Sequence, residues 1–199
     1  MASEPIDLRP SRTPETEAVL LDAALAELLA HGVRRTTASD IARRAGVSRQ
    51  TLYRYWPDAR GVFAALVTRE VLSALPAASE DPDDLDALVA LLVGTADALR
   101  AMPLLDRLRT TDPELFGRYI LTRLGTSQRA MHTAVAAQLE RGQERGFVRG
   151  GDPAALAAMV LLIAQSAVQS APLVAEWLDG DDWRAELTRA LAGYLGERR

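Results

Sequence analysis

Apolar residues recur every three or four positions along most of the chain, and no stretch alternates between apolar and polar residues as a half-buried β-strand would. The first such segment runs from Pro14 to His31, where Gly32 ends it. Another, at about residues 58–75, stops before a proline. Between them the pattern predicts two shorter helices. We therefore expect an all-α fold with about nine helices.

The second half of the chain predicts further helices, whose starts are marked by acidic residues or by Asp-Pro pairs. The preceding segment PAASEDP, residues 76–82, has the composition of a linker. Past this linker the apolar spacing predicts helices at about residues 83–102, 104–108, 112–146, 154–170 and 182–195.

Residues 36–56 predict two short helices joined by a tight turn. Thr37 can cap the first helix, and Asp40 three residues later completes a capping-box pattern. Gly46 can take the left-handed conformation that ends this helix at no steric cost. Ser48 can cap the second helix. This is the spacing of a helix-turn-helix, whose second helix enters the major groove of DNA.

The charge around this motif separates a DNA-binding unit from an ordinary helical hairpin. Residues 31–60 hold seven arginines and two aspartates, which gives a net charge of +5. The whole chain carries −4, so the remaining residues carry −9. A basic patch on an acidic protein indicates a local site for a polyanion. A simple hairpin would explain the apolar spacing but not this charge.

The run DIARRAGVSRQTLYRYW, residues 40–56, resembles the N-terminal domain of the TetR family of transcriptional repressors. The resemblance implies a homodimer that binds a palindromic DNA operator and is released by a small effector. It divides the chain into a flexible arm (1–13), a DNA-binding domain with a bridging helix (14–75) and a ligand-binding and dimerisation domain (83–199). The family often has a lysine where Ala59 stands, so no phosphate contact is carried over to that position.

The residues expected at DNA fall into two groups. Arg49 and Gln50 open the second helix and can read guanine and adenine, and Arg54 one turn later is a third candidate for a base or a flanking phosphate. Hydroxyl groups suit phosphate oxygens, and Arg44 fits either a phosphate contact or a solvated face. By resemblance, Thr37, Tyr53 and Tyr55 occupy phosphate-contacting positions. The complete predicted set is Thr37, Arg44, Ser48, Arg49, Gln50, Thr51, Tyr53, Arg54 and Tyr55.

Composition argues against several other classes of protein. No uninterrupted apolar run approaches the ~20 residues that span a bilayer, and the polar N-terminus predicts neither a signal peptide nor an anchor. The absence of cysteine excludes disulfides and thiolate metal sites and fits the cytoplasm. The chain has no phosphate-loop, dinucleotide-binding or hydrolase motif, and His31 and His132 lie in different predicted helices. We expect no enzyme activity, no cofactor and no metal.

The predicted helix at 154–170 is apolar around most of its circumference. Such a helix is buried on more than one side. It is either the central helix of its own bundle, or its second side packs against another copy of the protein. The resemblance favours the second interpretation, because TetR-like proteins dimerise through their last two long helices, here about 153–170 and 182–195.

A helical bundle can also hold a small molecule where apolar walls surround a few polar groups. A mostly apolar pocket predicts a hydrophobic or amphipathic effector, although ordinary packing or a solvated face explains each candidate residue more simply. The candidate ligand-binding residues are Met102, Leu105, Tyr119, Arg123, Met159, Gln165 and Trp177.

Two alternatives stay open at the level of sequence. A DNA-binding regulator without a small-molecule effector, controlled by a partner or by abundance or acting as an activator, would have an empty or filled bundle core. An enzyme or a non-DNA interaction module would show no salt-sensitive DNA binding.

Overall fold

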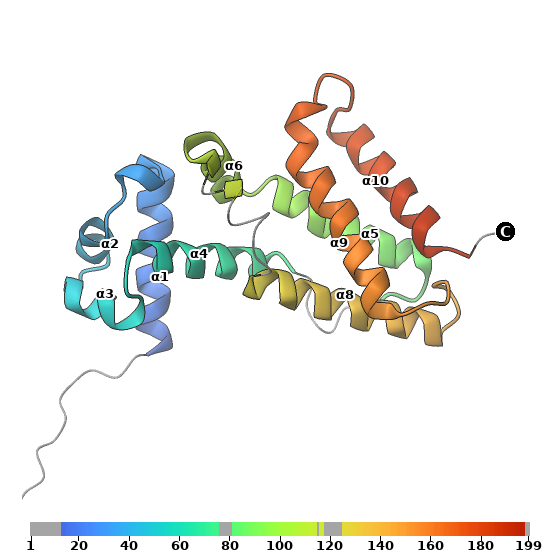
Figure 1. The fold of residues 1–199 in the computed structure, drawn as a ribbon, viewed down its shortest axis with the longest axis horizontal. Coiled ribbons are helices and arrows are strands. Elements are labelled where there is room, and N and C mark those ends of the chain that lie inside the picture. Colours follow the sequence, from blue (N-terminus) through green and yellow to red (C-terminus); the bar gives the residue numbers. More distant parts are fainter. Residues whose placement is uncertain (1–12, 76–80, 115, 118–124, 198–199) are drawn as a thin grey trace, which may run out of the picture. The chain divides into compact units, whose positions relative to one another are not determined.

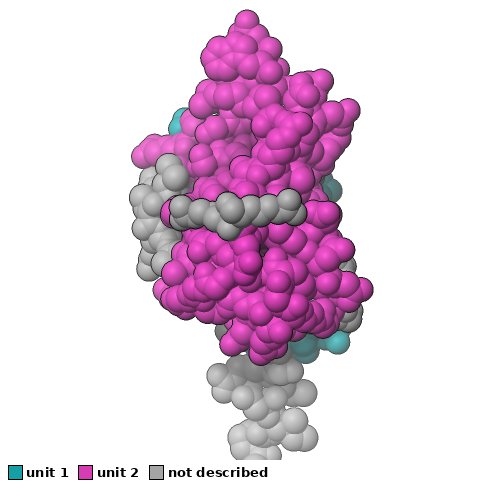
Figure 2. All heavy atoms as spheres, turned by 90° about the vertical axis from the view of Figure 1, so that its right-hand side faces the viewer, with its two compact units in different colours: residues 1–66 teal, residues 67–199 magenta. Residues whose placement is uncertain are grey.

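The computed structural model describes residues 13–75, 81–114, 116–117 and 125–197, and these form nine α-helices, two short 3₁₀ helices and no strand (Figure 1). The expected all-α fold with about nine helices is confirmed. The chain divides into two compact units, residues 1–66 (unit 1) and 67–199 (unit 2), which Figure 2 distinguishes by colour.

Unit 1 is built around a bundle of three helices. Its elements are α1 (Pro14–His31), η1 (Val33–Arg35), α2 (Ala38–Arg44), α3 (Arg49–Tyr55) and the first part of α4 (Ala59–Ser73). Helix α1 packs against α2, and α2 packs against α3. The side chains without exposed surface that hold unit 1 together include Leu20, Leu28, Ile41, Leu52 and Val62.

The predicted caps set the ends of α2 and α3. The Thr37 hydroxyl accepts the Asp40 backbone N–H at 3.3 Å, and the Asp40 carboxylate accepts the Thr37 N–H at 3.1 Å. This reciprocal pair satisfies two backbone donors at the start of α2. Gly46 takes a φ of 68° at the turn, and the Ser48 hydroxyl accepts the Thr51 N–H at 3.1 Å. The predicted helix-turn-helix geometry is therefore present.

Unit 2 is a helical bundle in which α9 packs against α8, α5 and α10, and α10 also packs against α5 (Figure 1). Because the boundary between the units lies inside α4, the last part of that helix belongs to unit 2. Its other elements are α5 (Leu85–Arg100), α6 (Pro103–Thr111), α8 (Thr126–Glu144), α9 (Pro153–Ser170), η2 (Ala171–Leu173) and α10 (Gly180–Leu195). The bundle core includes Leu88, Val89, Leu139, Leu156, Val160, Leu187 and Leu191.

Two predicted helix boundaries in unit 2 differ from the structure. The prediction of one helix from 112 to 146 fails because Gly125 is extended, with φ −72° and ψ 175°, and α8 begins after it. Asp112 closes α6, with its N–H donating to the Leu108 carbonyl at 2.9 Å. The predicted start at this position is also present, since residues 113–114 and 116–117 are helical and the Phe116 N–H donates to the Asp112 carbonyl at 3.0 Å. Helix α10 begins at Gly180 rather than at 182, because Asp179 caps it by accepting two backbone N–H groups.

Helix α9 leaves one apolar side open. By length and composition alone, α9 together with η2 could cross a membrane, but core helices of water-soluble proteins pass the same test. Only 17% of its most apolar 18-residue window is buried in the single chain. Leu156 and Val160 face the core, whereas Met159 and Leu162 are 43% and 63% exposed. The exposed positions recur at helical spacing and so form one stripe. This stripe, which we call the α9 face, consists of Ala155, Ala158, Met159, Leu162 and Ser166.

Candidate nucleic-acid interface

Helix α3 presents a polar face above a buried one. Leu52 has no exposed surface, whereas Arg49, Gln50, Tyr53 and Arg54 are all exposed. These four residues stand at positions one, two, five and six of the helix, so they share one side. The predicted base-reading residues therefore lie together on the surface of unit 1.

Arg49 and Tyr53 act as one group. The Arg49 Nη2 donates a hydrogen bond to the Tyr53 hydroxyl at 3.0 Å, and its guanidinium carbon lies 5.6 Å from the centre of the tyrosine ring. This cation–π contact, one helical turn apart, limits the conformations of both side chains. The remaining guanidinium N–H groups and the phenolic proton are donors suited to phosphate oxygens or base acceptors.

A hollow of about 470 Å³ opens beside this pair. Donor groups from the start of α2 and from α3 line it, and Asp58, which also lines it, accepts the Gly61 N–H at 2.8 Å. Hydroxyl and guanidinium groups in one concave surface can hold a phosphate oxygen. The hollow is lined by Thr36, Thr37, Ala38, Ser39, Arg49, Tyr53, Pro57, Asp58 and Ala59, of which the sequence predicted Thr37, Arg49 and Tyr53.

Hydrogen bonding fixes the charges around this surface. The pKa of Asp40 lies below its ordinary value, mainly because the Thr37 hydroxyl donates to it, with further help from the Thr37 N–H and from Arg43. Arg43 forms an ion pair with Asp40 at 2.7 Å. The Ser48 and Thr51 hydroxyls lie 2.9 Å apart and bond to each other within the cap of α3.

Tyr55 differs from its predicted role as a phosphate contact. Its side chain is 7% exposed. Its hydroxyl accepts the Thr13 N–H at 2.8 Å and donates to the Thr13 carbonyl at 3.3 Å. The phenol therefore fastens α3 to the start of α1, a contact between residues 42 positions apart that local spacing does not reveal.

Arg44 is an anchored residue at the edge of the site. Its Nε donates to the Glu27 carboxylate at 2.9 Å, and its side chain is 43% exposed. Glu27 is 7% exposed, and His31 Nε2 lies 3.5 Å from its second oxygen. Glu27 was not predicted as part of the site, although a carboxylate on the apolar side of α1 was a usable signal, since buried acids are normally paired.

The candidate ligand residues do not gather around the cavity that unit 2 presents beside η2. Met159 and Trp177 are exposed, at 43% and 74%, and Tyr119 and Arg123 lie outside the described residues. Met102, Leu105 and Gln165 are half-buried. Within the described part of the chain, no cluster of three or more histidine, aspartate or glutamate side chains could hold a metal ion.

Comparison with known proteins agrees with this geometry. Residues 20–66 match the model of the bacterial regulatory proteins of the tetR family. An uncharacterised HTH-type transcriptional regulator of Mycobacterium bovis is 45% identical over 181 residues, which cover 91% of this chain and 95% of that protein. The HTH-type transcriptional repressor SCO4008 of Streptomyces coelicolor is 30% identical over 145 residues, covering 72% and 73%.

Among solved structures, the complex of triclosan with SmeT superimposes with a TM-score of 0.62 at 23% identity, covering 92% of this chain and 93% of that one. SmeT is the repressor of a multidrug efflux pump of Stenotrophomonas maltophilia. The likeness at this identity concerns the fold. The capped helix-turn-helix, the basic exposed face of α3 and the extensive identity to HTH-type regulators together place this chain in the TetR family of DNA-binding transcriptional regulators, which are not enzymes.

Proposed function

We propose that the protein is a homodimeric repressor that binds a palindromic operator and is released by a small hydrophobic or amphipathic effector. The observation that carries the proposal is the exposed face of α3, where Arg49, Gln50, Tyr53 and Arg54 stand together on a basic unit of an acidic chain. Its binding partner is a double-stranded DNA operator, and it acts in the cytoplasm.

The side chains of this face have different tasks. Arg49 and Gln50 lie in the first turn of α3, the end that enters the major groove, where they read guanine and adenine. Arg54 contacts a base or the flanking phosphate. Thr37 and Tyr53 bind phosphate oxygens from the hollow beside α3, and they set the register of the protein on DNA. Ser48 and Thr51 support them through the cap.

The α9 face supplies the dimer contact. Its apolar stripe is too exposed for the isolated chain, and α10 lies beside it in the same bundle. A second copy packed on both helices would bury at least ~1,200 Å² in total, the lower range of stable interfaces. Two copies related by a two-fold axis can place their recognition helices ~34 Å apart, one turn of DNA.

Residues 14–75 would then form the DNA-binding domain and 83–199 the domain for dimerisation and the effector, with α4 as the lever between them. The solved complex of SmeT with triclosan supports an amphipathic effector by analogy. Met102, Leu105, Tyr119, Arg123, Met159, Gln165 and Trp177 remain the proposed effector contacts. The effector acts only through its different affinities for two arrangements of the dimer, and a full switch needs ~5.5 kcal/mol.

Selection of bound sequences from random double-stranded DNA tests the DNA-binding proposal. We expect an enriched palindrome whose binding weakens steeply with salt, because phosphate contacts release counterions. A selection that enriches no sequence, with binding insensitive to salt, would contradict it. The effector proposal fails separately if small molecules that bind tightly leave operator affinity unchanged.

A further inference from the structure

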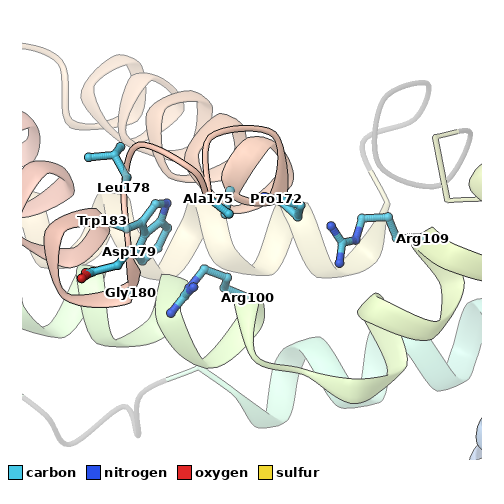
Figure 3. A pocket seen from close by; sticks show the side chains of 9 residues that line it. Arg100, Arg109, Pro172, Ala175, Leu178, Asp179, Gly180 and Trp183 are labelled. Carbon is cyan, nitrogen blue, oxygen red and sulfur yellow. The ribbon is translucent and has the colours of Figure 1, made fainter.

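We infer that unit 2 contains a binding site for a small organic carboxylate, in a cavity of about 240 Å³ beside the turn between α9 and α10. The turn covers one side of the cavity, and the end of α5 and helix α6 approach it from the other (Figure 3). The site is distinct from the DNA-reading face. It concerns ligand binding and does not rest on the proposed release of DNA.

One part of the cavity wall is apolar and held in place by a hydrogen bond. Pro172, Ala175 and Leu178 line it from the turn, and Trp183 lines it from the first part of α10. The indole N–H of Trp183 donates to the Ala167 carbonyl at 3.2 Å, which fixes the ring against α9. The volume is below the ~300–1,000 Å³ of drug-sized sites, so the ligand is a short aliphatic chain or a single ring.

Two guanidinium groups reach the same cavity from different helices, as Figure 3 shows for Arg100 on α5 and Arg109 on α6. Arg100 Nε and Nη2 donate to Asp97 at 3.0 and 2.7 Å, and the guanidinium carbon lies 4.8 Å from the centre of the Trp183 ring. These contacts orient Arg100 before any ligand binds. Its Nη1 makes no hydrogen bond to any residue that the structure describes.

Arg109 is the more available of the two. It pairs with Asp106 through Nη2 alone, and the Asp106 side chain is 58% exposed. An ion pair this exposed contributes little, so a ligand carboxylate can join or replace it. Guanidinium groups match the two oxygens of a carboxylate in geometry and charge.

Asp179 is the carboxylate that lines the cavity, and Asp97, which is not part of the lining, pairs with Arg100. Asp97 is shared between Arg100 and Arg184, whose Nη1 lies 3.0 Å away. Asp179 accepts the N–H groups of Asp181 and Asp182 at 2.8 and 2.9 Å. Both of these bonds are accepted by Oδ1 of Asp179. The cavity lining holds two guanidinium groups and this one carboxylate, so its net charge is positive and an anion with an apolar body fits the site better than a cation does.

Calorimetry on the full-length protein without DNA tests this site. The probes are hexanoate and benzoate, with hexanamide and benzamide as uncharged analogues of the same shape. Each carboxylate should bind at least roughly tenfold more tightly than its amide, and Arg109→Gln should remove most of that difference, the size expected for a hydrogen bond between charged groups. Arg109→Lys should retain part of it.

Arg43→Gln is the matched control, since Arg43 also pairs with an aspartate three residues earlier but lies in unit 1. It should leave carboxylate affinity unchanged. Equal binding of acids and amides, or equal effects of the two arginine variants, would overturn the assignment. So would an unmoved Trp183 indole N–H signal in NMR spectra, assigned by comparison with Trp56→Phe and Trp177→Phe. Operator release is measured separately, and its absence would contradict the proposed function but not this site.

Discussion

The two units of the chain differ in what they leave at their surfaces. In unit 1, apolar residues such as Ile41 and Leu52 are fully buried. The recognition helix α3 exposes mainly polar side chains. The exposed large aliphatic side chains of unit 1 are Val19 and Leu29 on α1. In unit 2, α9 exposes a continuous apolar stripe that includes Leu162. Unit 1 thus offers a surface for a hydrated polyanion, whereas unit 2 offers one for another apolar surface.

The strongest test of this contrast is a charge in the α9 face. Leu162→Glu should convert the proposed dimer to a monomer, because an unpaired carboxylate in an interface costs several kcal/mol (~3–5 for a buried unpaired charge). Light scattering should then give the single-chain mass of 21.5 kDa instead of about twice that value. Operator affinity should fall with it.

Leu29→Glu provides the control, since Leu29 is an exposed leucine of unit 1, at 38% exposure. This variant should remain a dimer. If both variants keep the double mass, the α9 face does not form the dimer contact.

A second test separates reading from positioning within α3. Gln50→Ala should change the preferred base at one position of each half-site, at a cost of ~1–3 kcal/mol there. Tyr53→Phe should weaken binding to all sequences about equally, because it removes the proposed phosphate donor and the hydroxyl that accepts the Arg49 hydrogen bond. Binding to a library of single-base operator variants measures both. A sequence change from Tyr53→Phe with a uniform loss from Gln50→Ala would reverse the assignment.

A third test concerns the cap that gives unit 1 its shape. Thr37→Ala removes the acceptor of the Asp40 N–H and should lower the free energy of unfolding by ~0.5–2 kcal/mol. Thr37→Ser retains the hydroxyl and should restore most of it. Urea unfolding followed by circular dichroism provides the measurement, and an unchanged midpoint for Thr37→Ala would show that the cap contributes nothing.

The smallest expected effect is acid sensitivity in unit 2. Burial alone would raise the pKa of Asp97, but its hydrogen bonds and charge interactions with Arg100 and Arg184 together hold the pKa below the ordinary value of 3.8. A carboxyl whose folded pKa is lowered stabilises the fold above its unfolded pKa and loses this contribution as the pH falls through the folded value. Asp97→Asn should therefore flatten the decline of stability below about pH 4. A parallel decline in both proteins would contradict this role.

Local features of unit 1 were predictable because their causes lie within a few residues. The cap from Thr37, the turn at Gly46 and the cap from Ser48 each depend on hydrogen bonds or backbone sterics over at most three positions. Helical periodicity likewise predicted Leu52 as core. The proposed base-reading set follows from the same periodicity, since it fixes which residues share the exposed side of α3.

Contacts between distant segments were not predictable in this way. Tyr55 and Tyr53 are both tyrosines on the recognition helix, yet packing buries Tyr55 against Thr13 and leaves Tyr53 exposed beside Arg49. The ion pair of Arg44 with Glu27 spans 17 positions. In unit 2, apolar periodicity continued through Gly125, and only the structure revealed the extended backbone there.

The sequence by itself determined the all-α class, the helix-turn-helix and its basic charge, because hydrogen bonds within one helical turn and the spacing of apolar residues are written along the chain. Tertiary structure alone decided which polar side chains remain exposed on unit 1, as Tyr53 does, and which hold helices together, as Tyr55 does. It also brought Arg100 and Arg109 to one cavity. These outcomes depend on which helices pack together, because packing brings into contact side chains that lie far apart in the sequence.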